Sequence, residues 1–243
     1  MEWFENWFDS PYYHILYKNR DYSEAEFFLD NLVNHLNPNA NESMLDLACG
    51  KGRHSYYLAN KGYQVTGLDL SAESINYATS KSKGNPQFAI HDLRENYLPQ
   101  HFKYVFNFFT SFGYFEDKTD NQNAINAMAH TLKPKGTLVI DFFNAIKVEK
   151  DLIPAETKLI DGITFNISRK IESGKVIKSI SFEDKNRQYN FEEKVQLIGM
   201  EEFETYLNKA GFDIVNRFGD YALEDFDEQK SSRLILEAQK NVG

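Results

Sequence analysis

The sequence predicts an α/β protein with a doubly wound, seven-stranded, mostly parallel sheet, helices at its N-terminus and an antiparallel β insertion. Short apolar runs alternate with helical patterns between residues 43 and 143, and this alternation is typical of βαβ units. After residue 143 the turn signals become those of β-hairpins. The 243 residues suffice for one large domain with a full core, so residues 1–243 are expected to form a single domain.

Residues 1–36 are expected to form a helical cap. Four aromatic residues share one face of its first helix: Trp3, Phe4, Trp7 and Phe8. Ser23, with Glu26 three residues later, has the pattern of a helix N-cap and capping box. The aromatic stripe predicts either core packing or a lid over a site.

Five apolar runs predict the first strands of the sheet: residues 44–47, 64–70, 87–90, 102–109 and 137–143. Helical patterns lie between them at residues 53–61, from Ser71 onward and at 120–132, and a turn is expected at 134–136. The last two runs are almost continuously apolar, as strands covered on both faces are.

An antiparallel insertion is expected at residues 155–199. Three runs predict its strands: residues 164–171, 176–182 and 189–198. Two dipeptides supply its turns: Asp161-Gly162 and Ser173-Gly174. Beyond it, residues 200–210 are helical with Gly211 as the cap, and residues 212–217 and 233–237 predict the two last strands of the main sheet.

Composition excludes several classes of function. The chain has 27 Lys and Arg against 36 Asp and Glu, a net charge of −9, which argues against a protein that holds nucleic-acid phosphates by charge. No apolar run is long enough for a transmembrane helix, so no membrane partner is expected. The single cysteine, Cys49, suits a reducing compartment, and Glu2, Glu5 and Asp9 stand where a signal peptide would be basic and apolar. We therefore expect a cytoplasmic protein.

A glycine-containing loop follows the first strand and precedes the first helix of the sheet. Gly50 and Gly52 allow a ligand close to the backbone and the helix N-terminus. Asp69 ends the next strand, 17 residues beyond Gly52, where a carboxylate can accept both hydroxyls of a ribose. Both dinucleotides and S-adenosylmethionine bind to such a loop.

Two residues favour S-adenosylmethionine. Ser55 stands where a dinucleotide fingerprint has its third glycine. Asp46, just before the glycines, would repel a pyrophosphate and attract an ammonium or sulfonium group. An NAD(P)-dependent oxidoreductase and a non-catalytic S-adenosylmethionine-binding partner subunit remain as alternatives.

Four segments in order resemble the motifs of class I S-adenosylmethionine-dependent methyltransferases. Residues 45–54 resemble the first motif, with Ala48 where the family usually has glycine; residues 67–71, 91–93 and 132–137 resemble those of the later strands. The resemblance implies a Rossmann-like sheet, S-adenosyl-L-methionine as the cofactor, and methyl transfer.

The motifs assign cofactor-binding residues by position. The position of the two acids beside the glycine loop predicts that Asp46 holds the ammonium group of the cofactor and Asp69 its ribose. The resemblance implies that Asp92 meets the adenine amino group. Arg20 is a candidate for pairing with the methionine carboxylate. The full expected set is Tyr17, Arg20, Asp46, Ala48, Cys49, Gly50, Gly52, Arg53, His54, Asp69, Leu70, Ser71, His91, Asp92, Leu93, Phe109 and Thr110.

The methyl acceptor is expected to be a small molecule, an amine or a hydroxyl compound. Residues 109–114 and the tyrosine-rich N-terminal segment are similar to those of sugar-amine N-methyltransferases. Tyr13, Tyr114 and Asn144 are the candidates for orienting the acceptor at the carboxyl edge of the sheet. The segment after the fourth strand lacks the Pro-Pro sequence of DNA-adenine methyltransferases and the cysteine of cytosine C5 methyltransferases. No nucleic acid is therefore expected. No cluster of His, Asp and Glu at ligand spacing suggests a metal-dependent enzyme, so no metal is expected. The protein is expected to be a monomer or a homodimer.

Overall fold

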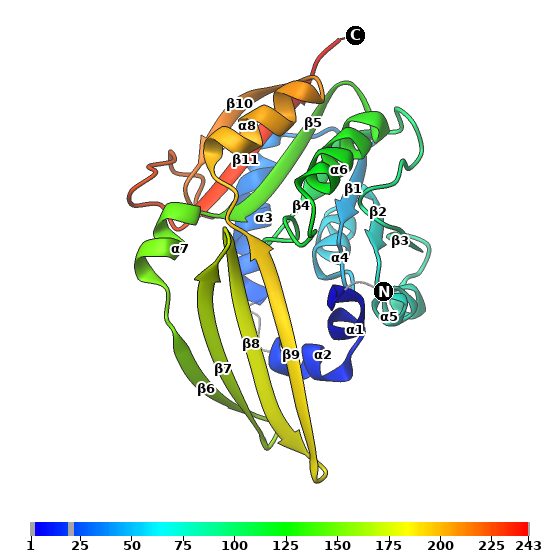
Figure 1. Ribbon diagram of the computed structural model, residues 1–243. Coiled ribbons are helices and arrows are strands. Elements are labelled where there is room, and N and C mark those ends of the chain that lie inside the picture. The colour runs from blue at the N-terminus through cyan, green and yellow to red at the C-terminus, as the bar shows by residue number, and fades with distance from the viewer. Residues whose placement is uncertain (1–2, 19–21, 243) are drawn as a thin grey trace.

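A seven-stranded sheet forms the centre of the computed structural model, which describes residues 3–18 and 22–242 (Figure 1). Its strands are β1 (Ser43–Leu47), β2 (Gln64–Asp69), β3 (Gln87–Ile90), β4 (Phe102–Asn107), β5 (Leu132–Phe143), β10 (Phe212–Phe218) and β11 (Arg233–Lys240). Their order is β10-β11-β5-β4-β1-β2-β3. The first five strands pair in parallel, and β11 runs antiparallel to both β5 and β10. The predicted mostly parallel, Rossmann-like sheet is confirmed.

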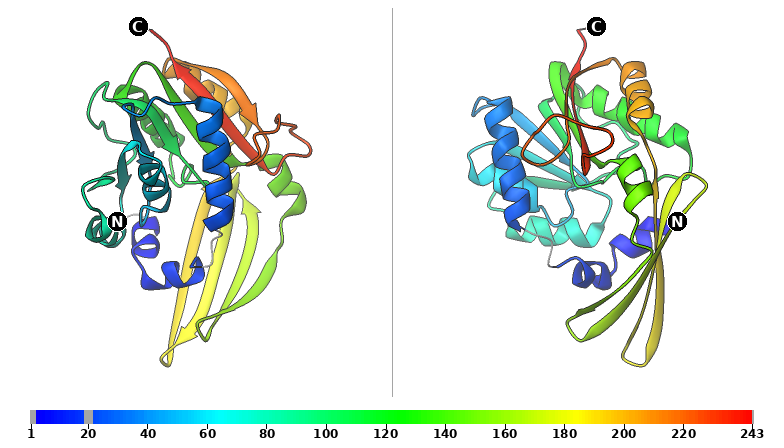
Figure 2. Two further views of the ribbon diagram at one scale, coloured as in Figure 1. Left: turned by 180° about the vertical axis from the view of Figure 1, so that it is seen from behind. Right: turned by 90° about the vertical axis from the view of Figure 1, so that its left-hand side faces the viewer.

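Helices cover both faces of this sheet (Figures 1 and 2). They are α3 (Tyr22–Leu36), α4 (Arg53–Asn60), α5 (Ala72–Lys81), α6 (Lys118–Thr131) and α8 (Met200–Lys209). On β5, Ile140 belongs to the core cluster that includes residues of α6 and α8, whereas Val139 belongs to the cluster that includes α3 and α4. Because successive strand residues point to opposite faces, each face receives its own core, and the continuous apolar run in β5 is explained.

A second sheet extends from one end of the molecule (Figure 1). It is an antiparallel meander of β6 (Ala155–Ile160), β7 (Ile163–Glu172), β8 (Lys175–Asp184) and β9 (Arg187–Gln196). The helices α1 (Trp3–Phe8) and α2 (Pro11–Leu16) pack on it through a core cluster that joins Trp7 and Leu16 to Phe165 and Phe182. Burying a large apolar side chain contributes roughly 1.5–3 kcal/mol, so this cluster stabilises the position of α1 and α2, called the cap below, on the second sheet.

The structure corrects several predicted boundaries. Ser23 lies inside α3 and is not its N-cap, and the side chains of Trp3 and Phe4 lie outside the described residues. The predicted turn at 134–136 falls inside β5 as a break in the strand register, with Lys135 at φ +56°. The strand predicted at 102–109 ends at Asn107, because the next residues bend into the loop that follows it.

Two elements were not predicted. Strand β6 is an edge strand with four of its six residues exposed, so it lacks the alternation of a half-buried strand. Helix α7 (Ala145–Asp151) has no buried residue and therefore no apolar face to recognise. None of the helices in the described ranges has the length and apolar character that crossing a lipid bilayer requires.

Candidate active site

A cavity of about 420 Å³ opens at the carboxyl ends of β1 to β4, under the cap helices. This is where the strand order reverses around β1, the usual ligand position in an open parallel sheet. The predicted residues that line it are Tyr13, Tyr17, Asp46, Ala48, Cys49, Gly50, Arg53, His54, Asp69, Leu70, Ser71, His91, Asp92, Leu93, Phe109 and Tyr114. Residues from the cap and from four strand ends thus meet in one place.

The loop after β1 is held by the end of β2. Asp69 accepts a hydrogen bond from the Gly50 backbone N–H at 2.7 Å through one carboxylate oxygen and from the Ser71 N–H at 2.8 Å through the other. Gly50 and Ala48 have φ values of +55° and +56°, a left-handed conformation that is easy for glycine and unfavourable for alanine. Burial raises the pKa of Asp69, against these hydrogen bonds, which lower it.

Gly67 explains why the loop can lie so close to β2. A side-chain carbon at this position would lie 2.6 Å from the ring of Phe88 and 2.9 Å from Sγ of Cys49. Only glycine leaves room for both, and Phe88 in turn covers the turn at Gly52. The sequence analysis singled out neither the packing role of Gly67 nor Phe88.

Asp46 is an acid buried at the end of β1. Its side chain is 1% exposed, and Ser55 of α4 donates a hydroxyl hydrogen bond to it at 2.5 Å. Burial raises the pKa of Asp46 to about 7, although the bond from Ser55 lowers it. Ser55, which breaks the dinucleotide glycine pattern, therefore serves to hold this acid in place.

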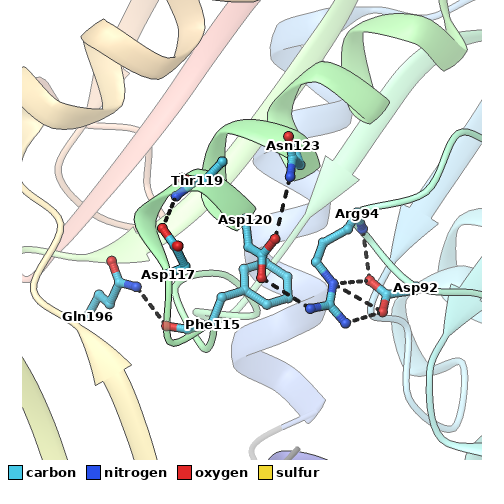
Figure 3. Close-up of polar contacts among 8 residues, drawn as sticks. All are labelled: Asp92, Arg94, Phe115, Asp117, Thr119, Asp120, Asn123 and Gln196. Carbon is cyan, nitrogen blue, oxygen red and sulfur yellow. Dashed lines mark hydrogen bonds and ion pairs between the residues drawn. The ribbon is translucent and has the colours of Figure 1, made fainter.

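Asp92, just past β3, is held by a neighbouring arginine (Figure 3). Arg94 donates from Nη2 to one oxygen of Asp92 at 2.6 Å and from Nε to the other at 3.0 Å. Burial would raise the pKa of Asp92, but the hydrogen bonds and charge of Arg94 outweigh it and lower the pKa. Arg94 was not among the residues predicted from the sequence.

The cap closes over the cavity from two sides. On one side Asp9 accepts hydrogen bonds from the Ser71 hydroxyl at 2.8 Å and the Glu73 N–H at 3.0 Å, at the N-terminus of α5. On the other side Tyr17 donates its hydroxyl to Glu193 of β9 at 2.6 Å. Asp9 satisfies one free N–H group at the start of α5 and lies at the positive end of the helix dipole.

The loop after β4 is fixed from behind by a buried ion pair. Phe109 and Thr110 have φ values of +54° and +60°, which carry a strain cost for residues other than glycine. Asp141 of β5 accepts a hydrogen bond from the Phe109 N–H at 2.8 Å and one from Arg233 Nε at 2.7 Å. The ring of Phe109 thereby stacks on His54, with centroids 4.9 Å apart and planes inclined by 9°.

Three predicted site residues are not brought to the cavity. Thr110 directs its hydroxyl to Arg233, which donates to it at 3.0 Å. Asn144 caps α7 by accepting from the Ile146 N–H, and its amide donates to the carbonyl groups of Glu228 and Ser231. Its role in orienting the acceptor is therefore corrected: its amide is used to hold a loop.

Gly52 is the remaining residue of the three. It lies at the N-terminus of α4 behind the lining, where it forms the turn at φ +80°. Arg20 lies outside the described residues. Cavity-lining residues that the sequence analysis did not propose are Phe8, His14, Lys18, Lys51, Ser74, Phe108, Ser111, Phe112, Gly113 and Phe115. Most of them directly flank proposed residues, so proximity in sequence was the available signal.

The residues present fit S-adenosylmethionine. Three acids lie at or just past the ends of β1, β2 and β3 and line one cavity together with the glycine loop. This donor set offers carboxylates for an ammonium group, for ribose hydroxyls and for an exocyclic amine. Such a sheet and such a site define a class I S-adenosylmethionine-dependent methyltransferase.

Comparison with known proteins supports the assignment to methyltransferases. A family model described as a methyltransferase domain matches residues 44–136. The chain is 31% identical to the putative methyltransferase YqeM of Bacillus subtilis over 209 residues, 82% of this chain and 84% of the relative. It is 32% identical to the dTDP-3-amino-3,6-dideoxy-alpha-D-glucopyranose N,N-dimethyltransferase of Streptomyces fradiae over 126 residues, 51% of this chain and 48% of that enzyme. The second match spans only about half of either protein.

Solved structures share the fold. A S-adenosylmethionine-dependent methyltransferase from Clostridium acetobutylicum superposes with a TM-score of 0.81 at 21% identity, covering 95% of this chain and 96% of that one. The S-adenosylmethionine-bound amino pentose methyltransferase CalS10 from Micromonospora echinaspora gives a TM-score of 0.72 at 18% identity, covering 96% and 98%.

The chain belongs to the class I S-adenosylmethionine-dependent methyltransferase family. It is an enzyme that uses S-adenosylmethionine as its methyl donor. The alternative of an NAD(P)-dependent oxidoreductase, left open by the sequence, is set aside by these matches.

Proposed function

We propose that this enzyme methylates an amino group of a small-molecule acceptor, with an amino sugar as the first candidate. The bound cofactor supplies an electrophilic methyl group. On the protein side, Asp46 accepts the ammonium group of the methionine part, Asp69 accepts the ribose hydroxyls and Asp92 accepts the adenine 6-amino group. The three strand ends, whose spacing the sheet fixes, thereby set the position of the reactive methyl group.

The acceptor is placed by the aromatic wall on the cap side of the cavity. Phe8 lies edge-on to Tyr13 and to Tyr114, with ring centroids 5.1 and 5.3 Å apart. Tyr114 donates its hydroxyl to the Thr110 carbonyl at 2.8 Å, so its ring is fixed. A rigid aromatic wall excludes water and limits the orientations of the acceptor, and good alignment is worth roughly 7–11 kcal/mol.

The demand for a general base favours an amine over a hydroxyl group, because two of the three histidines in the lining, His54 and His91, hold protein partners through Nε2. Nε2 of His54 lies 3.0 Å from the Arg53 guanidinium, and Nε2 of His91 lies 3.0 Å from the Glu95 carbonyl. In each of these two rings Nε2 is thus engaged by the protein itself. A hydroxyl acceptor needs a strong general base in its transition state, whereas a neutral amine is already nucleophilic.

The names of two relatives support the same choice. The enzyme of Streptomyces fradiae and a second one from Streptomyces venezuelae, 29% identical over 126 residues, are both N,N-dimethyltransferases of dTDP-linked 3-amino sugars. Their matches to this chain cover 48% and 52% of their own lengths, so the amino sugar is offered here as a proposal.

A matched pair of acceptors tests the proposal. We would supply dTDP-3-amino-3,6-dideoxyglucose and its 3-hydroxy counterpart, and follow S-adenosylhomocysteine release and product mass. The amine is expected to react with a kcat/KM at least ~100-fold higher, the usual contribution of a general base that the hydroxyl compound would require. Equal or preferred methylation of the hydroxyl compound would overturn the amine assignment.

A further inference from the structure

Arg94 lies behind two residues of the cavity wall. Asp92 and Phe115 line the cavity, whereas Arg94 is not part of the lining. The guanidinium of Arg94 contacts both: it forms the two-pronged hydrogen bond with Asp92 and lies 5.0 Å from the centroid of the Phe115 ring. Figure 3 shows Arg94 between Asp92 and Asp120, beside the Phe115 ring.

Arg94 is itself held in one orientation. Its Nη1 donates to Asp120 of α6 at 3.2 Å, and its backbone N–H donates to Asp92 at 2.9 Å. The Phe115 ring beneath it is anchored because Gln196, at the end of β9, donates from its side-chain amide to the Phe115 carbonyl at 2.7 Å. The planar fork of an arginine fixes a carboxylate in direction as well as in charge, which a lysine cannot do.

This arrangement decides which hydrogen bonds Asp92 can offer. An ionised carboxylate only accepts hydrogen bonds, whereas a protonated one also donates. Arg94 engages both oxygens of the Asp92 carboxylate, and Asp92 lines the cavity, so a ligand at this wall meets an ionised carboxylate. A group that donates, such as an aromatic amine, is favoured there, and a carbonyl oxygen meets the negative charge unfavourably.

We propose that Arg94 is a positioning residue that makes the cofactor site selective for a 6-amino purine over a 6-oxo purine. The inference rests on the proposed placement of adenine at Asp92. Arg94 lies behind the lining; it acts by keeping the Asp92 carboxylate ionised and by fixing its orientation at the cavity wall. Asp120, on the far side of Arg94, accepts from Nη1 and takes no part in the fork to Asp92.

Calorimetric titration with two ligands tests the proposal. S-adenosylhomocysteine and S-inosylhomocysteine differ only in the 6-amino or 6-oxo group, so the ratio of their Kd values measures the selectivity. The unaltered protein is expected to prefer the adenosyl compound by about 100-fold, the scale of a charge-assisted hydrogen bond gained in one case and lost in the other. Arg94→Gln is expected to lower this ratio at least about tenfold, with Arg94→Lys between the two because it keeps the charge without the fork.

Asp120→Asn is the matched control. It removes the acid on the other side of Arg94 while the fork to Asp92 stays, so it is expected to lower the melting temperature and to leave the ratio within about threefold. If Arg94→Gln weakens both ligands equally, Arg94 is only a structural tie and the proposal is wrong. Should Arg94→Gln fail to fold, the ratio for Arg94→Lys decides: a ratio equal to that of the unaltered protein would also overturn the proposal.

Asp92→Asn separates the role of Arg94 from the placement of adenine at Asp92, on which that role rests. An amide can accept or donate, so the ratio is expected to collapse toward one. An unchanged ratio in Asp92→Asn would show that adenine does not lie at Asp92, and the proposed cofactor placement would fail. A collapse in Asp92→Asn with no change in Arg94→Gln would leave that placement standing and overturn the role of Arg94 alone.

Discussion

Tyr17 of the cap donates its hydroxyl to Glu193 of the antiparallel sheet across 2.6 Å. Glu193 also accepts from the indole N–H of Trp7 at 2.7 Å and pairs with Lys178 at 3.3 Å. Tyr17 lines the cavity, whereas Glu193, Trp7 and Lys178 do not. The hydrogen bond between Tyr17 and Glu193 therefore joins the cavity wall to a sheet that contributes no residue to the cavity lining. The insertion therefore supports the active site by holding its cap.

Replacing Glu193 with alanine should loosen the cap. The change leaves Lys178, whose pKa burial already lowers, without its carboxylate partner and with only the Tyr17 side chain beside it. Breaking a buried ion pair in this way costs about 3–5 kcal/mol. We expect a loss of unfolding free energy of about 3 kcal/mol by urea denaturation, together with weaker S-adenosylhomocysteine binding. Glu192→Ala, whose side chain is half exposed on the opposite face of β9, is the control; equal losses in both variants would contradict the role of Glu193.

Cofactor affinity should depend on pH through Asp46. Burial raises its pKa to about 7, so the carboxylate is mostly ionised at pH 8 and mostly neutral at pH 6. Only the ionised form attracts an ammonium group. The Kd for S-adenosylhomocysteine should therefore rise as pH falls below 7, approaching about tenfold per pH unit. Calorimetry from pH 6 to pH 8 checks this, with Asp46→Asn expected to bind weakly and without the pH dependence. A flat profile in the unaltered protein would refute the assignment.

The same acid should destabilise the ligand-free fold at high pH. The folded pKa of Asp46, about 7, lies above its ordinary value of 3.8, so the folded state holds a proton that the unfolded chain releases. Unfolding free energy attributable to Asp46 therefore falls as pH rises from about 4 to 7 and is constant above 7. Asp46→Asn should gain up to about 4 kcal/mol relative to the unaltered protein between pH 4 and pH 8. Urea denaturation at both pH values measures this gain, and no relative gain would show that the acid is not buried in this way.

Gly67 should be intolerant of even one added carbon. Alanine there would place Cβ 2.6 Å from the Phe88 ring and 2.9 Å from Cys49 Sγ, an overpacking that costs about 1–3 kcal/mol. Removing the ring in Gly67→Ala/Phe88→Ala should cost less than the sum of the two single changes, because the clash disappears. Gly199→Ala, where the added carbon meets nothing within 4 Å, is the control and should change stability by less than about 1 kcal/mol. Strict additivity in the double variant would argue against the clash.

The sequence by itself determined the central sheet and its ligand edge. Period and length identify β1 to β5, and Asp46 and Asp69 follow from their positions at strand ends, because such signals are written in neighbouring residues. Asp92, just past the third strand, was assigned from the resemblance to the methyltransferase family. The packing of α1 and α2 on the insertion was not predictable in the same way. An aromatic stripe indicates that one face of a helix is buried, but it does not indicate which other element covers that face.

Only the tertiary structure decided which distant residues support the site. Tyr17 and Glu193 are 176 positions apart, and Arg233 and Asp141 are 92 apart. No local pattern connects such pairs, because each member is compatible alone with a solvent-exposed surface. Asn144 shows the converse: its position after β5 indicated an acceptor site, yet its amide closes a contact with the loop at 228–231. Strand ends are placed by short-range periodicity, whereas hydrogen-bond partners are chosen by the packing of the whole chain.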